Sequence, residues 1–343
     1  MELSKVRLNA MVVFTTAVGF VVGSKMNAAP FPGAAAPGFD WRRFWWTCLG
    51  TFLAAAGASA FNQAAEARRD ARMHRTRNRP LVTGQLSRTY AATFGLIVSI
   101  LGVAILCPTS NGIAASLAAI NVLLYIAIYT PMKPLTAANT LVGAIVGGIP
   151  PVIGWAAATG SVVPGALVLG AILFLWQIPH FLALAWMYKD DYARGGFKML
   201  SVVEPTGRLS GRLAMLYTVL LIPVCLMLTY FQNAGVIFAA VACMLTAGMA
   251  AVALRFAMTR TRDDARALFL ASIAYLPLLS TTLMLDSRTP LGGYIRTDAG
   301  FLLVPADQPA AIDPESAQGR ALQSLAPETP ALPAAESAGP PRP

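Results

Sequence analysis

Nine stretches of this sequence are apolar for long enough to cross a lipid bilayer. A membrane-spanning helix needs roughly 20 mostly apolar residues. The nine stretches that meet this length are 6–24, 43–62, 89–107, 111–130, 138–158, 165–186, 211–230, 234–256 and 265–285. The sequence therefore predicts an all-α integral membrane protein whose membrane domain, 1–290, is a bundle of nine transmembrane helices.

The composition excludes an ordinary soluble domain. Hydrophobic residues make up 56% of the chain and charged residues only 12%, whereas soluble domains average about 25% charged residues. The net charge of +10 could by itself suggest a nucleic-acid partner. The charges lie in loops between apolar stretches, however, where membrane topology explains them better, so we expect no nucleic acid as a partner.

Lysine and arginine indicate the orientation in the membrane. With the N-terminus in the cytoplasm, 19 of the 26 basic residues fall on the cytoplasmic side, as the positive-inside rule requires. The first stretch could instead be a signal peptide, because Lys5 and Arg7 precede its apolar core, but it is long enough to span. No mitochondrial presequence is recognisable, which favours a multi-pass protein of a bacterial plasma (inner) membrane.

The last 43 residues differ in character from the rest. Residues 301–343 hold nine of the 24 prolines and many alanines, and they contain no apolar stretch long enough to span. Such a composition cannot bury a core, and we expect a disordered tail.

A dense polar cluster follows the second apolar stretch without a break. It reads NQAAEARRDARMHRTRNRPL, residues 62–81, and holds Asn62, Glu66 and Asp70 at a spacing of four. If the helix continues, these side chains share one face, and their oxygens suit Mg²⁺. The alternative is a solvated helix end in which Glu66 pairs with neighbouring arginines.

Basic side chains accompany these acids in the loops expected on the same membrane face. Arg75 and Arg79 follow the acidic triplet, and Lys133 stands between two prolines in YTPMKP. The loop 187–209 adds a second mixture of acid and base, Asp190, Asp191, Arg194 and Lys198. Arginine suits phosphate oxygens, so three loops together form the pattern that a site for Mg²⁺ and diphosphate needs.

His180 lies inside the sixth apolar stretch, in WQIPHFLALAW. A histidine within a membrane could ligate a metal or porphyrin iron, act as a base, or form a hydrogen bond with a neighbour. The residues alone leave these roles open.

Three segments resemble a known family. Residues 62–81, 129–160 and 176–202 are similar to signature segments of the haem O synthases, which are intramembrane prenyltransferases of the UbiA superfamily. The resemblance extends over about residues 3–285. It implies a UbiA-type bundle of nine helices around a central cavity open to lipid. It also implies transfer of the farnesyl group of farnesyl diphosphate to a vinyl group of haem B, which gives haem O with the help of Mg²⁺.

The resemblance also implies roles for individual residues. Its first acidic motif matches Asn62, Glu66 and Asp70 as Mg²⁺ ligands. Its second is matched only in part, with Asp191 the better candidate for a ligand than Asp190, and a second Mg²⁺ position stays open. We expect the phosphate oxygens to meet Arg75, Arg79, Lys133 and Lys198, and His180 to ligate or orient haem. A downstream haem A synthase is a candidate partner.

Two other functions compete with this one. A prenyltransferase acting on an aromatic ring of a quinone precursor would share the Mg²⁺ site, and the residues alone do not choose the acceptor. A transporter would place charges near the middle of the bilayer, often at broken helices. The charges here gather toward one membrane face, which disfavours transport.

Overall fold

The computed structural model describes residues 6–26, 38–287, 292–297 and 300–305. Within this part of the chain, nine helical segments are long and apolar enough to span a membrane, as predicted. Eight are single helices: α1 (Val6–Met26), α2 (Trp41–Asp70), α3 (Arg88–Thr109), α6 (Asn139–Thr159), α7 (Pro164–Met187), α10 (Arg208–Tyr230), α11 (Val236–Thr259) and α12 (Arg262–Asp286). The remaining span is built from α4 (Gly112–Leu123), η1 (Leu124–Tyr129) and α5 (Thr130–Met132).

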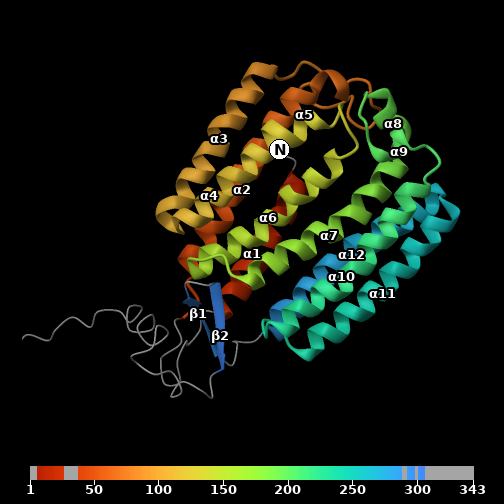
Figure 1. Ribbon diagram of the computed structural model, residues 1–343. Helices are drawn as coiled ribbons and strands as arrows, with labels where there is room; N and C mark the ends of the chain where they lie inside the picture. The colour runs from red at the N-terminus through yellow and green to blue at the C-terminus, as the bar shows by residue number, and fades with distance from the viewer. Residues whose placement is uncertain (1–5, 27–37, 288–291, 298–299, 306–343) are drawn as a thin grey trace, which may run out of the picture. The chain divides into compact units, whose positions relative to one another are not determined.

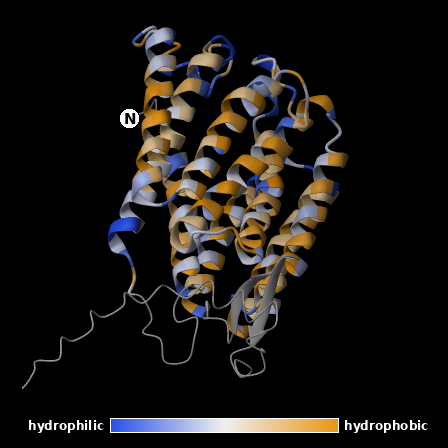
Figure 2. Ribbon diagram, turned by 60° about the vertical axis from the view of Figure 1, so that its left-hand side comes forward, coloured by the Kyte–Doolittle hydropathy of each residue, from blue (hydrophilic) through white to orange (hydrophobic). Residues whose placement is uncertain are grey.

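The bundle presents its apolar side chains to the outside as well as to its core. Figure 2 shows hydrophobic residues along the helices and hydrophilic ones gathered near their ends. On α3, for example, Leu96, Ile97 and Ile100 are all about half exposed. In water such a surface would be unfavourable, whereas lipid tails solvate it, so the exposure pattern agrees with the membrane assignment.

The helices pack in pairs around a buried centre. α1 lies against α6, α2 against α3, and α7 against α6, α10 and α12. Figure 1 shows α6 and α7 running through the middle of the bundle. Both are among the more deeply buried spans, and Trp155 and Ile172 are almost fully enclosed. These two helices therefore line the interior of the bundle.

Small residues bring α2 and α3 unusually close. A side chain at Gly57 would place its Cβ 2.4 Å from the carbonyl oxygen of Gly95, and one at Gly95 would come within 2.6 Å of the carbonyl oxygen of Gly57. Membrane helices often associate through such small residues. The close contact fixes the position of α2, which carries the acidic triplet.

The composite fourth span contains a π-helical turn, η1. Pro131 follows this turn and has no N–H to offer the carbonyl of Ala127, four residues before it. Instead, the backbone N–H and the hydroxyl of Thr130 both bond to the carbonyl of Tyr125. Tyr125 and Tyr129 both lie on this turn. Turns of this kind often mark functional sites.

The loop after α7 contains two short helices, α8 (Lys189–Arg194) and α9 (Leu200–Val203). Figure 1 shows them at the same end of the bundle as α5. The three loops that carry the acidic and basic motifs therefore meet at one end, as expected.

Beyond the bundle, β1 (Gly292–Thr297) and β2 (Gly300–Pro305) form an antiparallel hairpin that is a unit of its own. β2 falls at the start of the stretch 301–343 for which a disordered tail was expected, and that expectation stays a prediction. GGYIRT and GFLLVP are rich in residues that favour strands. The rest of the predicted tail, 306–343, lies outside the described residues.

Candidate functional site

The acidic triplet lies on a single helix and is buried. α2 continues eight residues past its predicted end, to Asp70. Asn62, Glu66 and Asp70 are 0%, 7% and 1% exposed. The alternative of a solvated helix end is therefore wrong, because all three side chains face the interior of the bundle.

Each carboxylate of the triplet contacts a cation from another part of the chain. Lys133 Nζ lies 2.7 Å from a Glu66 oxygen, and Arg79 Nη1 lies 2.5 Å from an Asp70 oxygen. Lys133 also lies over the ring of Tyr129, 4.5 Å from its centroid. Burial alone would lower the pKa of Lys133, but attraction to Glu66 outweighs it and the pKa is raised. Lys133 is therefore a permanent cation at neutral pH.

Asn62 is held by the π-helical turn. Its amide Nδ2 donates to the hydroxyl of Thr130 at 3.1 Å, and its oxygen accepts from the hydroxyl of Tyr125 at 3.5 Å. The π-helical turn and the loop after it thus support both Asn62 and Glu66 (through Lys133). The sequence did not single out Tyr125 or Tyr129, although both flank the basic motif YTPMKP.

The loops after α2 and α7 are joined at Asp191. Its carboxylate accepts a 3.1 Å hydrogen bond from the backbone N–H of His74 and pairs with Arg194. Burial opposes ionisation, but these bonds outweigh it and lower the pKa of Asp191. Asp191 is thus ionised at neutral pH and lies where the two acidic segments meet.

Arg75 is held between aromatic rings of the second loop. Its guanidinium lies 4.8 Å from the ring centroid of Tyr188 and 5.6 Å from that of Tyr192. It also donates to the Tyr192 hydroxyl at 3.2 Å. The aromatic faces and the hydrogen bond orient this cation. The sequence analysis assigned Arg75 to phosphate but did not identify these two tyrosines as its neighbours.

Two predicted site residues lie apart from this arrangement. The side chains of Asp190 and Lys198 are exposed, whereas the other predicted acidic and amide ligands are buried. In the described part of the chain the cavity wall includes Arg75, Arg79 and Lys133, but not Lys198 or any of the predicted acidic and amide ligands. Lys198 contributes through its backbone instead, since its N–H donates to the carbonyl of Lys133 at 2.9 Å. Their predicted roles remain predictions, with less structural support than those of Arg75, Arg79 and Lys133.

A cavity of about 480 Å³ extends from these cations into the bundle. Arg75, Arg79 and Lys133 are part of its wall, together with Tyr125, Tyr129 and Tyr192. Apolar residues of α6 and α7, including Val146, Ile153, Leu173 and Trp176, line it as well. The cavity therefore offers a cationic, tyrosine-lined part that can hold an anion and an apolar part that can hold a hydrocarbon.

His180 is also part of the cavity wall. Its ring is stacked between Trp176 and Phe269, with ring centroids 5.2 and 4.7 Å away. Its Nδ1 lies 2.8 Å from the hydroxyl of Ser272 on α12. His180 therefore borders the same cavity as the cations, as a role toward a second substrate requires.

The donor set can be compared with what Mg²⁺ needs. In the described part of the chain, no three His, Cys, Asp or Glu side chains gather closely enough to hold a metal by themselves. Mg²⁺ commonly binds one or two carboxylates and takes its other oxygens from water and substrate phosphates. Glu66 and Asp70 on one helix face, with the Asn62 amide beside them, fit that mode.

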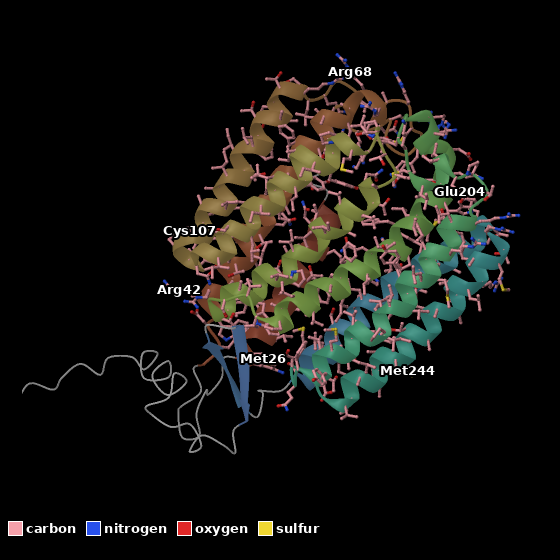
Figure 3. The ribbon with its side chains drawn as sticks, in the orientation of Figure 1. Met26, Arg42, Arg68, Cys107, Glu204 and Met244 are labelled. Atoms are coloured by element: carbon pink, nitrogen blue, oxygen red, sulfur yellow. The ribbon has the colours of Figure 1, made fainter. Side chains whose placement is uncertain are left out.

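The candidate site lies toward one end of the bundle. Figure 3 labels residues near both ends: Arg68 and Glu204 lie toward the end that carries the site, and Met26, Arg42 and Met244 lie toward the other. This agrees with the sequence-based argument against a transporter with charges at mid-membrane.

Residues 12–275 match the UbiA prenyltransferase family. The chain belongs to this family. It is 42% identical to the human mitochondrial protoheme IX farnesyltransferase over 85% of its own length and 62% of that protein. It is 40% identical to the protoheme IX farnesyltransferase of Solibacter usitatus over 83% of its length and 97% of that protein. The resemblance drawn from the three motifs is confirmed.

The chain thus spans less than two thirds of the human relative and nearly all of the bacterial one. Among solved structures, it resembles a digeranylgeranylglyceryl phosphate synthase with a TM-score of 0.68 and 15% identity, over 83% of this chain and 96% of that one. It also resembles a UbiA homologue of Archaeoglobus fulgidus bound to GPP and Mg²⁺, with a TM-score of 0.54 and 13% identity, over 82% and 99%. These likenesses confirm the UbiA fold.

Proposed function

We propose that this protein transfers the farnesyl group of farnesyl diphosphate to a vinyl group of haem B, forming haem O and releasing diphosphate. The relatives of about 40% identity carry the name protoheme IX farnesyltransferase. The observation that carries the proposal is that a rim of Arg75, Arg79 and Lys133 continues into an apolar interior within one and the same cavity. A prenyl diphosphate has the same two parts.

The diphosphate binds at the cationic rim. Arg79 and Lys133 contact Asp70 and Glu66, and each can donate toward phosphate oxygens on its other side. Glu66, Asp70 and Asn62 would hold Mg²⁺, with Asp191 as a further acidic ligand from the second loop. When bound, Mg²⁺ supplies charge stabilisation for the leaving diphosphate.

The reaction begins when the allylic C–O bond breaks. The bonding electron pair leaves with the diphosphate, and Arg75, Arg79 and Lys133 stabilise the negative charge that develops there. The farnesyl cation stays in the apolar part of the cavity, where Val146, Leu173 and other apolar side chains exclude water that would quench it.

The haem vinyl group supplies the new bond. Its π-electrons attack the farnesyl carbon that lost the diphosphate, which forms a C–C bond and leaves a cation on the vinyl carbon next to the porphyrin. A water molecule adds to that carbon and loses a proton, giving the hydroxyalkyl group of haem O. His180, on the wall of the same cavity, would orient the haem by binding its iron.

The same proposal covers the setting in the cell. The protein would lie in a bacterial inner membrane with its N-terminus and the loops of the site in the cytoplasm, as the distribution of basic residues supports. The product would then be passed on to a haem A synthase.

Pigment analysis tests the choice of acceptor. The protein is expressed in a bacterium that lacks its own haem O synthase, and haems extracted from its membranes are separated and identified by mass. We expect haem O with the protein and only haem B without it. A prenylated quinone precursor in place of haem O would identify the rival acceptor and overturn the proposal.

A further inference from the structure

The hydrogen bonds around His180 constrain where its ring proton lies. Nδ1 of His180 and the hydroxyl oxygen of Ser272 are 2.8 Å apart. The same hydroxyl oxygen lies 2.7 Å from the backbone carbonyl oxygen of Phe269. Ser272 is fully buried on α12. Its hydroxyl must therefore find its hydrogen-bond partners within the protein.

A count of protons assigns the donors. A carbonyl oxygen only accepts, so the one hydroxyl proton of Ser272 must point to Phe269. The serine oxygen is then left as an acceptor toward His180. Nδ1 must therefore carry the imidazole proton, and in the neutral ring Nε2 keeps its lone pair.

The rest of the surroundings fixes the plane of the ring. Trp176 and Phe269 stack on it with interplanar angles of 23° and 28°. Trp176 itself is anchored, because its Nε1 donates to the carbonyl of Ser272 at 2.8 Å. Nε2 points away from Ser272, on a residue that lines the cavity, and no hydrogen bond to it is found among the described residues.

We propose that Ser272 is a positioning residue that fixes His180 in the Nδ1-protonated form and so presents the Nε2 lone pair to the iron of haem B. The inference rests on the proposed function for the identity of the substrate. Residues that bond to the far nitrogen of a metal-binding histidine commonly set its ring orientation and basicity. A hydroxyl can do this without adding charge to the membrane interior.

The tautomer can be measured without haem. The chain has only two histidines, His74 and His180, so ¹⁵N-histidine NMR of the purified protein gives few signals, and a His74→Gln variant assigns them. We expect a protonated Nδ1 and an unprotonated Nε2 for His180. The opposite tautomer would overturn the inference while leaving the proposed function untouched.

Haem binding tests the consequence. Ser272→Ala should weaken haem B binding about 10- to 100-fold and alter the absorption bands that report an axial histidine. Ser272→Thr, which keeps a hydroxyl, should retain both. Ser280→Ala, a buried serine two turns along α12, is the matched control and should behave as the unmodified protein.

Binding of a farnesyl diphosphate analogue is measured on the same variants and should stay within about twofold, because that ligand depends on the loops after α2 and η1. An unchanged haem affinity and spectrum in Ser272→Ala would overturn the inference. An unmodified protein that binds no haem B would instead overturn the proposed function.

Discussion

The site residues come in pairs of opposite charge. Glu66 holds Lys133, Asp70 holds Arg79 and Asp191 holds Arg194. Buried carboxylates without a partner would be costly, so these pairs stabilise the site before substrate arrives. If Mg²⁺ and diphosphate bind as proposed, the cations would turn to the phosphates and the carboxylates to the metal.

The first prediction follows from this pairing at Asp70. Asp70→Asn keeps the size of the side chain but removes the charge that holds Arg79 and would bind Mg²⁺. We expect farnesyl transfer to fall by at least about 100-fold, measured as haem O per unit of inserted protein. Asp263→Asn, an exposed acid on α12, is the control. Normal haem O formation by Asp70→Asn at ordinary Mg²⁺ would remove Asp70 from the site.

The second prediction separates the two lysines that the sequence assigned to phosphate. Lys133 lines the cavity and contacts Glu66, whereas Lys198 is exposed. Lys133→Gln should therefore raise the KM for farnesyl diphosphate much more than Lys198→Gln does.

Lys133→Gln should also lower the Tm, because it breaks the ion pair between Lys133 and the buried Glu66. Breaking a buried pair in other proteins lowers the free energy of unfolding by about 3–5 kcal/mol. Equal effects of the two substitutions on KM would show that the loop of Lys198 closes onto the substrate.

At the scale of elements, the lengths of the apolar stretches in the sequence predicted all nine spans found in the described part of the chain. The prediction succeeds because a span depends mainly on local composition. It placed the end of α2 too early, since the polar face of Asn62, Glu66 and Asp70 is buried by other loops rather than by lipid. It also missed η1. The register shift there depends on the bonds of Thr130 to Tyr125 and Asn62, and no apolar pattern reveals such bonds.

The third prediction concerns this turn. Thr130→Val keeps the shape of the side chain and removes the hydroxyl that bonds Tyr125 and Asn62. We expect a loss of about 1–3 kcal/mol of stability and a weaker response of activity to Mg²⁺. Thr282→Val on α12 removes a hydroxyl that bonds only the carbonyl of Leu278, and should change neither Mg²⁺ response nor activity. If both variants respond alike to Mg²⁺, the turn does not support the site.

The fourth prediction concerns the joint between the two acidic loops. Tyr192→Phe removes the hydrogen bond to Arg75 but keeps the ring, whereas Tyr192→Leu removes both. Affinity for a farnesyl diphosphate analogue should fall in two steps, and each step should be several-fold at most, since cation–π contacts contribute about 0.5–2 kcal/mol. An unchanged affinity in Tyr192→Leu would show that Arg75 needs no such support.

At the scale of the whole molecule, the convergence of three loops at one end follows from the alternation of spans and basic loops. The sequence therefore predicted which motifs would meet. It did not predict which side chains reach inward. Lys133 and Lys198 look alike in the sequence, yet only the former lines the cavity, because the fold of 187–199 turns Lys198 outward and uses its backbone N–H. The role of Ser272 was also hidden, since it lies 92 residues from His180.

The central claim is that one cavity joins a diphosphate site to a haem site. The most direct test uses the purified protein in lipid vesicles with farnesyl diphosphate, Mg²⁺ and an equimolar mixture of haem B and a quinone-precursor aromatic acid. We predict haem O, identified by mass, as the sole prenylated product, with formation abolished by chelating Mg²⁺ and by Asp70→Asn. Prenylation of the aromatic acid with haem B left unchanged would contradict the account.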